Sequence, residues 1–118
     1  MNNELVKIEN GKAVTTSKII AKEFGKEHKH VLESVDNIFK TLEKDRLKIR
    51  SMFKTFEKDW SKIGPMFKES TYKDDYGRLL RCIDVDWDGF MLLAMGFTGA
   101  KALKAKLAFI EAFSYLES

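Results

Sequence analysis

Six polar side chains suited to nucleic-acid chemistry lie within one short stretch of the sequence: Lys26, His28, Lys29, His30, Ser34 and Asn37. Lysine and histidine can contact phosphates, serine can bond a base edge, and asparagine can bridge an adenine. The first four would lie at the N-terminal end of a helix, the end that contacts bases when a recognition helix enters the major groove. Glu33, in the same stretch, favours the alternative of a helix face that is only solvated.

Residues 16–31 predict the elements that would position these side chains, two helices joined by a tight turn. Ala21 is small where the helices would cross, Gly25 stands where the chain turns left-handed, and Val31 would fill the core. This spacing predicts a helix-turn-helix. Two helices that merely close a core would show the same spacing.

The limits of both helices are indicated by capping residues and by apolar spacing. Thr16 or Ser17 can cap the first helix, which would run to about residue 24. The second helix would begin near Glu27, because apolar residues then recur at helical spacing. These residues are Val31, Val35, Ile38 and Leu42.

Two β-hairpins are predicted, one on each side of the helix pair. In residues 5–16 the pair Asn10-Gly11 supplies the turn, because both residues tolerate a positive φ. In residues 67–85 a β-prone run follows a cluster of turn residues. That cluster contains Asp74, Asp75 and Gly77.

The second hairpin follows the candidate recognition helix, where a winged-helix protein carries its wing. Lys73, Tyr76 and Arg78 at its tip could contact phosphate or a minor groove. Asp74 and Asp75 count against close phosphate contact. A hairpin that simply closes the fold is the alternative interpretation.

Two more helices complete the predicted fold. Asp86 can cap a short apolar helix over 87–95, ended by Gly96, and Thr98 can cap the last helix. The inward face of the last helix is predicted to carry Ala102, Leu103, Phe109, Ile110, Phe113 and Leu116. The expected fold class is α+β and winged-helix-like, in a single domain over 1–118.

An internal repeat lies between the second helix and the second hairpin. FKTLEKDRLKI (39–49) and FKTFEKDWSKI (53–63) match at 8 of 11 positions with an offset of 14 residues, which is two heptads. We therefore expect a helical arm over about 46–63 that ends at Gly64-Pro65. It is either an insertion of variable length or an arm that packs against a second subunit.

Composition fits one cytoplasmic globular domain. The chain has 118 residues, a net charge of +3 and a single cysteine, Cys82, which cannot form an internal disulfide. No run is long and apolar enough for a signal peptide or a membrane span. Residues 1–63 carry 14 Lys and Arg against 10 Asp and Glu, and this basic half fits a polyanionic partner.

Metal and catalytic chemistry find little support in the sequence. His28 and His30 are the only histidines, and a helix would point them roughly 160° apart. Residues 84–95 begin like a calcium-binding EF-hand loop, but Met95 stands where a bidentate Glu is needed. No nucleophile with a base and no phosphate-binding glycine loop is present, so we expect neither a cofactor nor an enzyme.

Three segments in this order resemble the Rha family of phage regulatory proteins: TTSKIIAKEFGKEHKHVLESV (15–35), FKESTYKDDYGR (67–78) and DGFMLLAMGFTGAKALKAKLAFIEAF (88–113). The resemblance covers roughly residues 14–116. It implies a temperate-phage or prophage protein that regulates phage or host gene expression, with no catalytic residues.

The resulting hypothesis is a phage transcriptional regulator that binds double-stranded DNA as a homodimer. The arm or the last helix would supply the dimer interface. The expected DNA-binding residues are Ser17, Lys18, Lys26, His28, Lys29, His30, Ser34, Asn37, Lys73 and Arg78. The alternative is an antirepressor that binds a phage or host repressor through the apolar arm without contacting DNA.

Overall fold

The computed structural model of the chain describes residues 4–44 and 66–117. The predicted helical arm at 46–63 lies outside the described residues. Within them the elements follow in the order β1 (Lys7–Glu9), β2 (Lys12–Thr16), α1 (Ser17–Phe24), α2 (His28–Lys44), β3 (Phe67–Lys73), β4 (Leu79–Asp86), α6 (Trp87–Ala94) and α7 (Ala100–Glu117).

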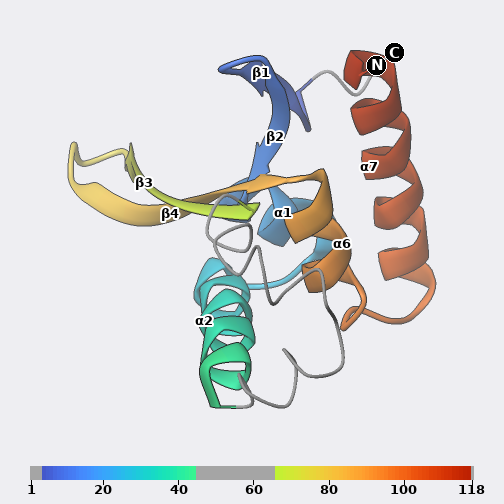
Figure 1. Ribbon diagram of the computed structural model, residues 1–118. Coiled ribbons are helices and arrows are strands. Elements are labelled where there is room, and N and C mark those ends of the chain that lie inside the picture. The colour runs from blue at the N-terminus through green and yellow to red at the C-terminus, as the bar shows by residue number, and fades with distance from the viewer. Residues whose placement is uncertain (1–3, 45–65, 118) are drawn as a thin grey trace.

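The strands form one antiparallel sheet in the order β1-β2-β4-β3. Each predicted hairpin is present, and β2 and β4 join them, with Val14 opposite Asp86 and Thr16 opposite Asp84. Asn10 and Gly11 both have positive φ, as the first turn requires. The β3–β4 hairpin extends away from the helices, α2 lies below it, and α7 forms the opposite edge of the molecule (Figure 1).

The core lies between the sheet and the helices and is centred on phenylalanine rings. Phe90 and Phe109 are almost fully buried, with ring centroids 4.7 Å apart, and the ring of Phe24 stacks on Phe109 at 5.9 Å. Val31 and Val35 bring α2 into the same core, and both are fully buried. These contacts fix the rotation of α2 about its own axis.

The turn between α1 and α2 has the predicted geometry. Thr16 caps α1 by accepting a hydrogen bond from the Ile19 backbone N–H at 3.2 Å. Gly25 ends α1 in the left-handed conformation with φ of 69°, and a Cβ there would also collide with the Lys101 side chain. Ala21 is 4% exposed where the helices cross.

The α+β class is confirmed, whereas the winged-helix arrangement stays a prediction. The candidate wing is not a separate appendage, because β4 also pairs with β2 and so belongs to the central sheet. Asp86 caps α6 as predicted, accepting a hydrogen bond from the Gly89 N–H at 2.8 Å. The helix ends one residue earlier than predicted, with Met95 rather than Gly96 at its C-cap.

The predicted inward face of α7 is wrong at two positions. Leu103 is 58% exposed and Ile110 is 41% exposed, because the buried face of the helix consists of Ala102, Ala105, Phe109, Ala112 and Phe113. The helix begins at Ala100, so the residue before it is Gly99 and not the predicted cap, Thr98. Apolar residues therefore lie on two sides of α7, and only one side packs in the core.

Candidate nucleic-acid interface

The outward face of α2 is exposed because its opposite face is fixed in the core by Val31 and Val35. Residues about half a turn away from these two must point to solvent. The exposed residues of this outward face include Lys29, Glu33, Lys40 and Lys44. Within the part of the chain that the structure describes, Lys29 forms no ion pair. Its charge is available to a ligand.

Lys26 and His30 lie at the same end of α2 and are also exposed. The Lys26 ammonium lies 4.7 Å from the centroid of the Phe97 ring, a cation–π contact that leaves the group at the surface. His30 Nε2 lies 3.5 Å from a carboxylate oxygen of Glu27. The structure therefore brings Lys26, Lys29 and His30 together at the start of the predicted recognition helix.

Ser17 and His28 point into the fold instead. Ser17 is fully buried, and its hydroxyl accepts a hydrogen bond from the Ile83 backbone N–H at 3.0 Å. The same oxygen lies 2.8 Å from His28 Nε2 and 3.5 Å from the Cys82 sulfur. These contacts join the first residue of α1, the first residue of α2 and strand β4. They argue against direct DNA contact by Ser17, and the proposal below omits both residues.

Burial keeps His28 neutral. Loss of solvent lowers the pKa of His28 below its ordinary value, and the positive charges of Lys18 and Arg81 lower it further. The His28 ring lies 5.8 Å from the ring of Tyr72, and the Lys18 ammonium lies 4.1 Å from the centroid of that same Tyr72 ring. Lys18 thus lies beside strand β3, exposed but already in contact with an aromatic ring.

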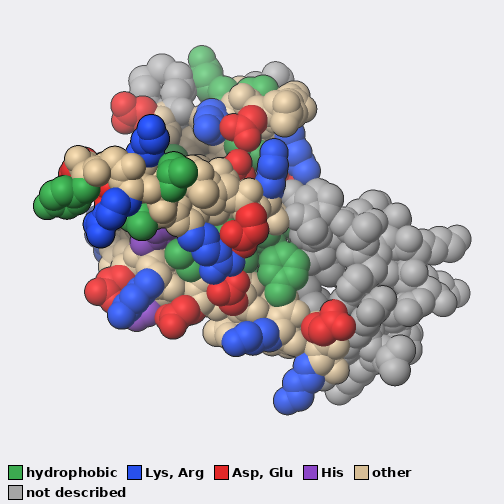
Figure 2. Space-filling view, turned by 90° about the vertical axis from the view of Figure 1, so that its left-hand side faces the viewer, with side chains coloured by type: hydrophobic (Ala, Val, Ile, Leu, Met, Phe, Trp, Pro, Cys, Tyr) green, Lys and Arg blue, Asp and Glu red, His purple; other side chains and the backbone are tan. Residues whose placement is uncertain are grey.

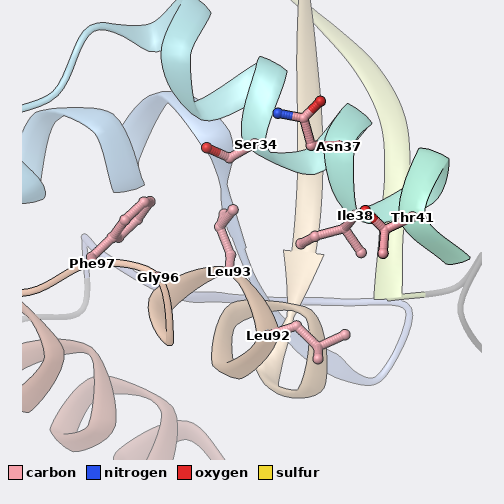
Figure 3. A pocket seen from close by; sticks show the side chains of 8 residues that line it. All are labelled: Ser34, Asn37, Ile38, Thr41, Leu92, Leu93, Gly96 and Phe97. Atoms are coloured by element: carbon pink, nitrogen blue, oxygen red, sulfur yellow. The ribbon is translucent and has the colours of Figure 1, made fainter.

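Ser34 and Asn37 line a pocket between α2 and α6 rather than the centre of the outward face. This pocket has a volume of about 410 Å³, and its lining is formed by Ser34, Asn37, Ile38, Thr41, Leu92, Leu93, Gly96 and Phe97. Ser34 points towards Leu93, whereas the amide of Asn37 points away from it (Figure 3). The Ser34 hydroxyl donates to the His30 carbonyl at 3.0 Å. Of the two, Asn37 is the more accessible to a duplex.

The tip of the β3–β4 hairpin is less basic than its sequence indicates. Arg78 forms an ion pair with Asp74 at 2.7 Å, and Asp74 also accepts the Arg78 backbone N–H. Arg78 additionally lies 5.4 Å from the ring of Tyr76, which is 85% exposed. Lys73 is exposed at the end of β3. The tip therefore offers one lysine, one exposed aromatic ring and an arginine whose charge is already paired.

Arg81 is the residue that sequence reasoning missed. Its guanidinium donates hydrogen bonds to both carboxylate oxygens of Asp36 on α2, at 3.0 and 2.8 Å, and to both of Glu69 on β3, at 2.9 and 2.7 Å. These bonds lower the pKa of each carboxyl group and raise the pKa of Arg81. Arg81 thereby holds the hairpin against α2. Nothing in the local sequence connects residues so far apart along the chain.

Positive and negative side chains alternate over the face from which the hairpin projects (Figure 2). Arg78 and Arg81 are both paired with carboxylates there. The basic excess of the first half of the sequence therefore does not become one uniform positive surface. Any contact with a polyanion depends on a few lysines around the start of α2.

Neither a metal site nor a membrane span is found in the described ranges, 4–44 and 66–117. No three side chains of the His, Cys, Asp and Glu types are arranged there to hold an ion. None of the helices described there combines the length and apolarity that crossing a bilayer requires. His28 is already engaged by Ser17, and His30 by Glu27.

Comparison with known proteins assigns the chain to a family. The family model of the phage regulatory protein Rha matches residues 15–118, and the chain belongs to this family. This confirms the resemblance carried by the three sequence segments.

Two relatives extend the comparison. An uncharacterised 22.8 kDa protein from the gp15–gp3 intergenic region of Salmonella phage P22 is 35% identical over 115 residues, 98% of this chain and 50% of its own length. An uncharacterised protein of Haemophilus influenzae is 29% identical over 103 residues, 87% of this chain and 51% of its own length. The chain thus spans about half the length of these relatives. No solved structure matches it.

Proposed function

We propose that this member of the Rha family regulates phage or prophage transcription by binding double-stranded DNA through the start of α2. The observation that supports this most is the exposed group of Lys26, Lys29 and His30 at the N-terminal end of a helix whose rotation is fixed by the buried Val31 and Val35. A helix held in this way can present the same side chains to each duplex it meets. Lys26 and Lys29 contact phosphates, and Asn37 reaches a base edge.

The hairpin contributes to the same surface because it is braced against α2. The Arg81 bridge between Asp36 and Glu69 and the packing of His28 on Tyr72 connect the two elements. Lys18 and Lys73 extend the positive charge along β3, so they contact the backbone beside the groove. The paired Arg78 contributes less than an unpaired arginine would.

Charge reversal at the start of α2 tests this function. The double variant Lys26→Glu/Lys29→Glu is compared with the wild type for binding of duplexes from the control region of the encoding phage or prophage, by fluorescence anisotropy at several salt concentrations. Loss of two phosphate contacts lowers the slope of log affinity against log salt by about 2. Affinity falls for every sequence tested.

The matched control is Lys7→Glu/Lys68→Glu, which changes net charge by the same amount on β1 and β3. Lys7 forms an ion pair with Glu9, and Lys68 acts on that same glutamate, so both lie at the far side of the sheet from α2. If the control weakens binding as much as the α2 variant does, binding is a matter of net charge and the proposed surface is wrong. If the wild type binds no duplex at low salt but captures a purified phage repressor, the antirepressor hypothesis replaces DNA binding.

A further inference from the structure

α7 has a second apolar face that the core leaves uncovered. Leu103, Leu107 and Ile110 are 58%, 57% and 41% exposed. Their spacing of four and three residues places them on one side of the helix. A helix with apolar residues on two sides is typical of one that is covered on both. The fold of this chain covers only the side that carries Phe109 and Phe113.

The exposed face continues onto α6. Met91 is 41% exposed and Met95 is 73% exposed. Both border a pocket of about 100 Å³ between the two helices, and its lining also includes Phe90, Ala94, Lys106 and Ile110. Five residues therefore form one apolar patch: Met91, Met95, Leu103, Leu107 and Ile110. Methionine is common at protein-binding surfaces because its side chain adapts to the partner.

The charges along α7 indicate which partner the apolar patch fits. The first part of the helix carries Lys101, Lys104 and Lys106, and the later part carries Glu111 and Glu117. Lys104 and Glu111 are seven residues apart and lie on the same flank of the patch. When two copies of such a helix pair antiparallel, the lysine-rich part of one lies beside the glutamate-rich part of the other. Charges that flank an apolar seam are what set partner choice and orientation between paired helices.

We propose that two copies of this chain associate through the apolar patch, with their α7 helices antiparallel about a two-fold axis near Leu107. Leu107 of each copy meets Leu107 of the other, and a side chain of one copy enters the pocket bordered by Met91 and Met95 of its partner. Lys104 of each copy pairs with Glu111 of the other. A two-fold contact uses the same surface on both copies and therefore closes at two.

This surface leaves the candidate nucleic-acid interface accessible. α7 forms the edge of the molecule opposite the β3–β4 hairpin, and α2 lies away from it (Figure 1). The interface is about one helix wide, at the small end of specific protein interfaces, so the dissociation constant is on the order of micromolar. Dimerisation does not depend on the proposed function, since the apolar patch would pair two copies whether or not α2 binds DNA.

Sedimentation velocity of the full chain without DNA, from about 1 to 500 µM, tests the proposal. The wild type shifts from monomer to dimer across this range. Leu107→Glu places a charge in the centre of the seam and raises the dissociation constant at least about a hundredfold. Circular dichroism confirms that the variant is folded, as expected for a residue that is 57% exposed.

Two further variants make the result specific. Leu79→Glu changes a leucine on β4 that is 66% exposed, and it leaves self-association unchanged. Lys104→Glu weakens the dimer about tenfold because two symmetric ion pairs are lost, and Lys104→Glu/Glu111→Lys restores it. A wild type that is monomeric at 500 µM overturns the proposal. So does a Leu107→Glu variant that still dimerises, or an equal loss in Leu79→Glu. A double charge swap that fails to restore association overturns the antiparallel arrangement.

Discussion

Two neighbouring buried hydroxyls should respond to deletion with opposite signs. Ser17 is fully buried, and its oxygen is the acceptor for the Ile83 backbone N–H at 3.0 Å. Ser17→Ala leaves that N–H unsatisfied inside the sheet and removes the contact with His28. An unsatisfied buried donor costs about 1–3 kcal/mol, so the free energy of unfolding should fall by that amount. This is a large part of the stability of a domain of this size.

Thr15, the residue before the cap of α1, provides the contrast. It is 1% exposed, and its hydroxyl has no hydrogen-bond partner among the residues that the structure describes. Thr15→Val keeps the branched shape that suits a strand and removes an unpaired buried polar group. The free energy of unfolding should rise by about 0.5–2 kcal/mol. The double variant should fall between the two single ones.

Urea unfolding at pH 7.5, followed by circular dichroism, measures both changes. The dependence of the free energy on urea should be the same for all variants, which shows that a similar surface is exposed on unfolding. The reasoning is refuted if Ser17→Ala costs less than about 0.5 kcal/mol, since the hydrogen bond to Ile83 then contributes little. It is equally refuted if Thr15→Val destabilises as much as Ser17→Ala, because the satisfaction of hydrogen bonds would then not decide the sign.

The remaining predictions concern titration and the bridge between elements. Because burial lowers the pKa of His28 in the folded chain, the unfolded chain binds the proton first, and stability should fall as pH drops from about 6.5 to 5. In His28→Gln, urea unfolding at both pH values should show a smaller fall. Arg81→Met should lower stability by about 0.5–1 kcal/mol, since Arg81 is 40% exposed. That difference from the wild type should disappear below about pH 4, where Asp36 and Glu69 become protonated.

Much of the fold could be predicted from local signals because local chemistry determines it. Thr16 caps a helix and Gly25 ends it in a left-handed conformation, and neither effect needs a distant residue. Asn10-Gly11 determines the first hairpin in the same way. The pairing of β2 with β4, by contrast, joins segments about 70 residues apart, and no local pattern specifies it.

The sites were harder to predict because the direction of a side chain depends on packing. His28 and Lys29 are adjacent and both polar, and the sequence assigned both to DNA. In the structure His28 turns towards Ser17 and Tyr72, while Lys29 turns to solvent. A step of 100° along the helix separates the two, and only the contacts of Val31 and Val35 determine which points outward. The same reason explains Leu103 and Ile110, which apolarity alone assigned to the core.

The inward-facing residues at the start of α2 still belong to the proposed function, although they contact no ligand. Ser17 and His28 attach the first turn of α2 to β4, and Arg81 attaches its middle to β3. Both attachments hold the helix at one angle to the hairpin, which decides whether Lys26 and Lys29 can meet phosphates while Asn37 meets a base. A substitution that loosens these attachments changes how well the surface fits a duplex but leaves its charge unchanged. Affinity and the salt dependence of affinity therefore report on different residues of the same helix: the fit depends on the buried polar contacts, and the slope depends on the exposed lysines.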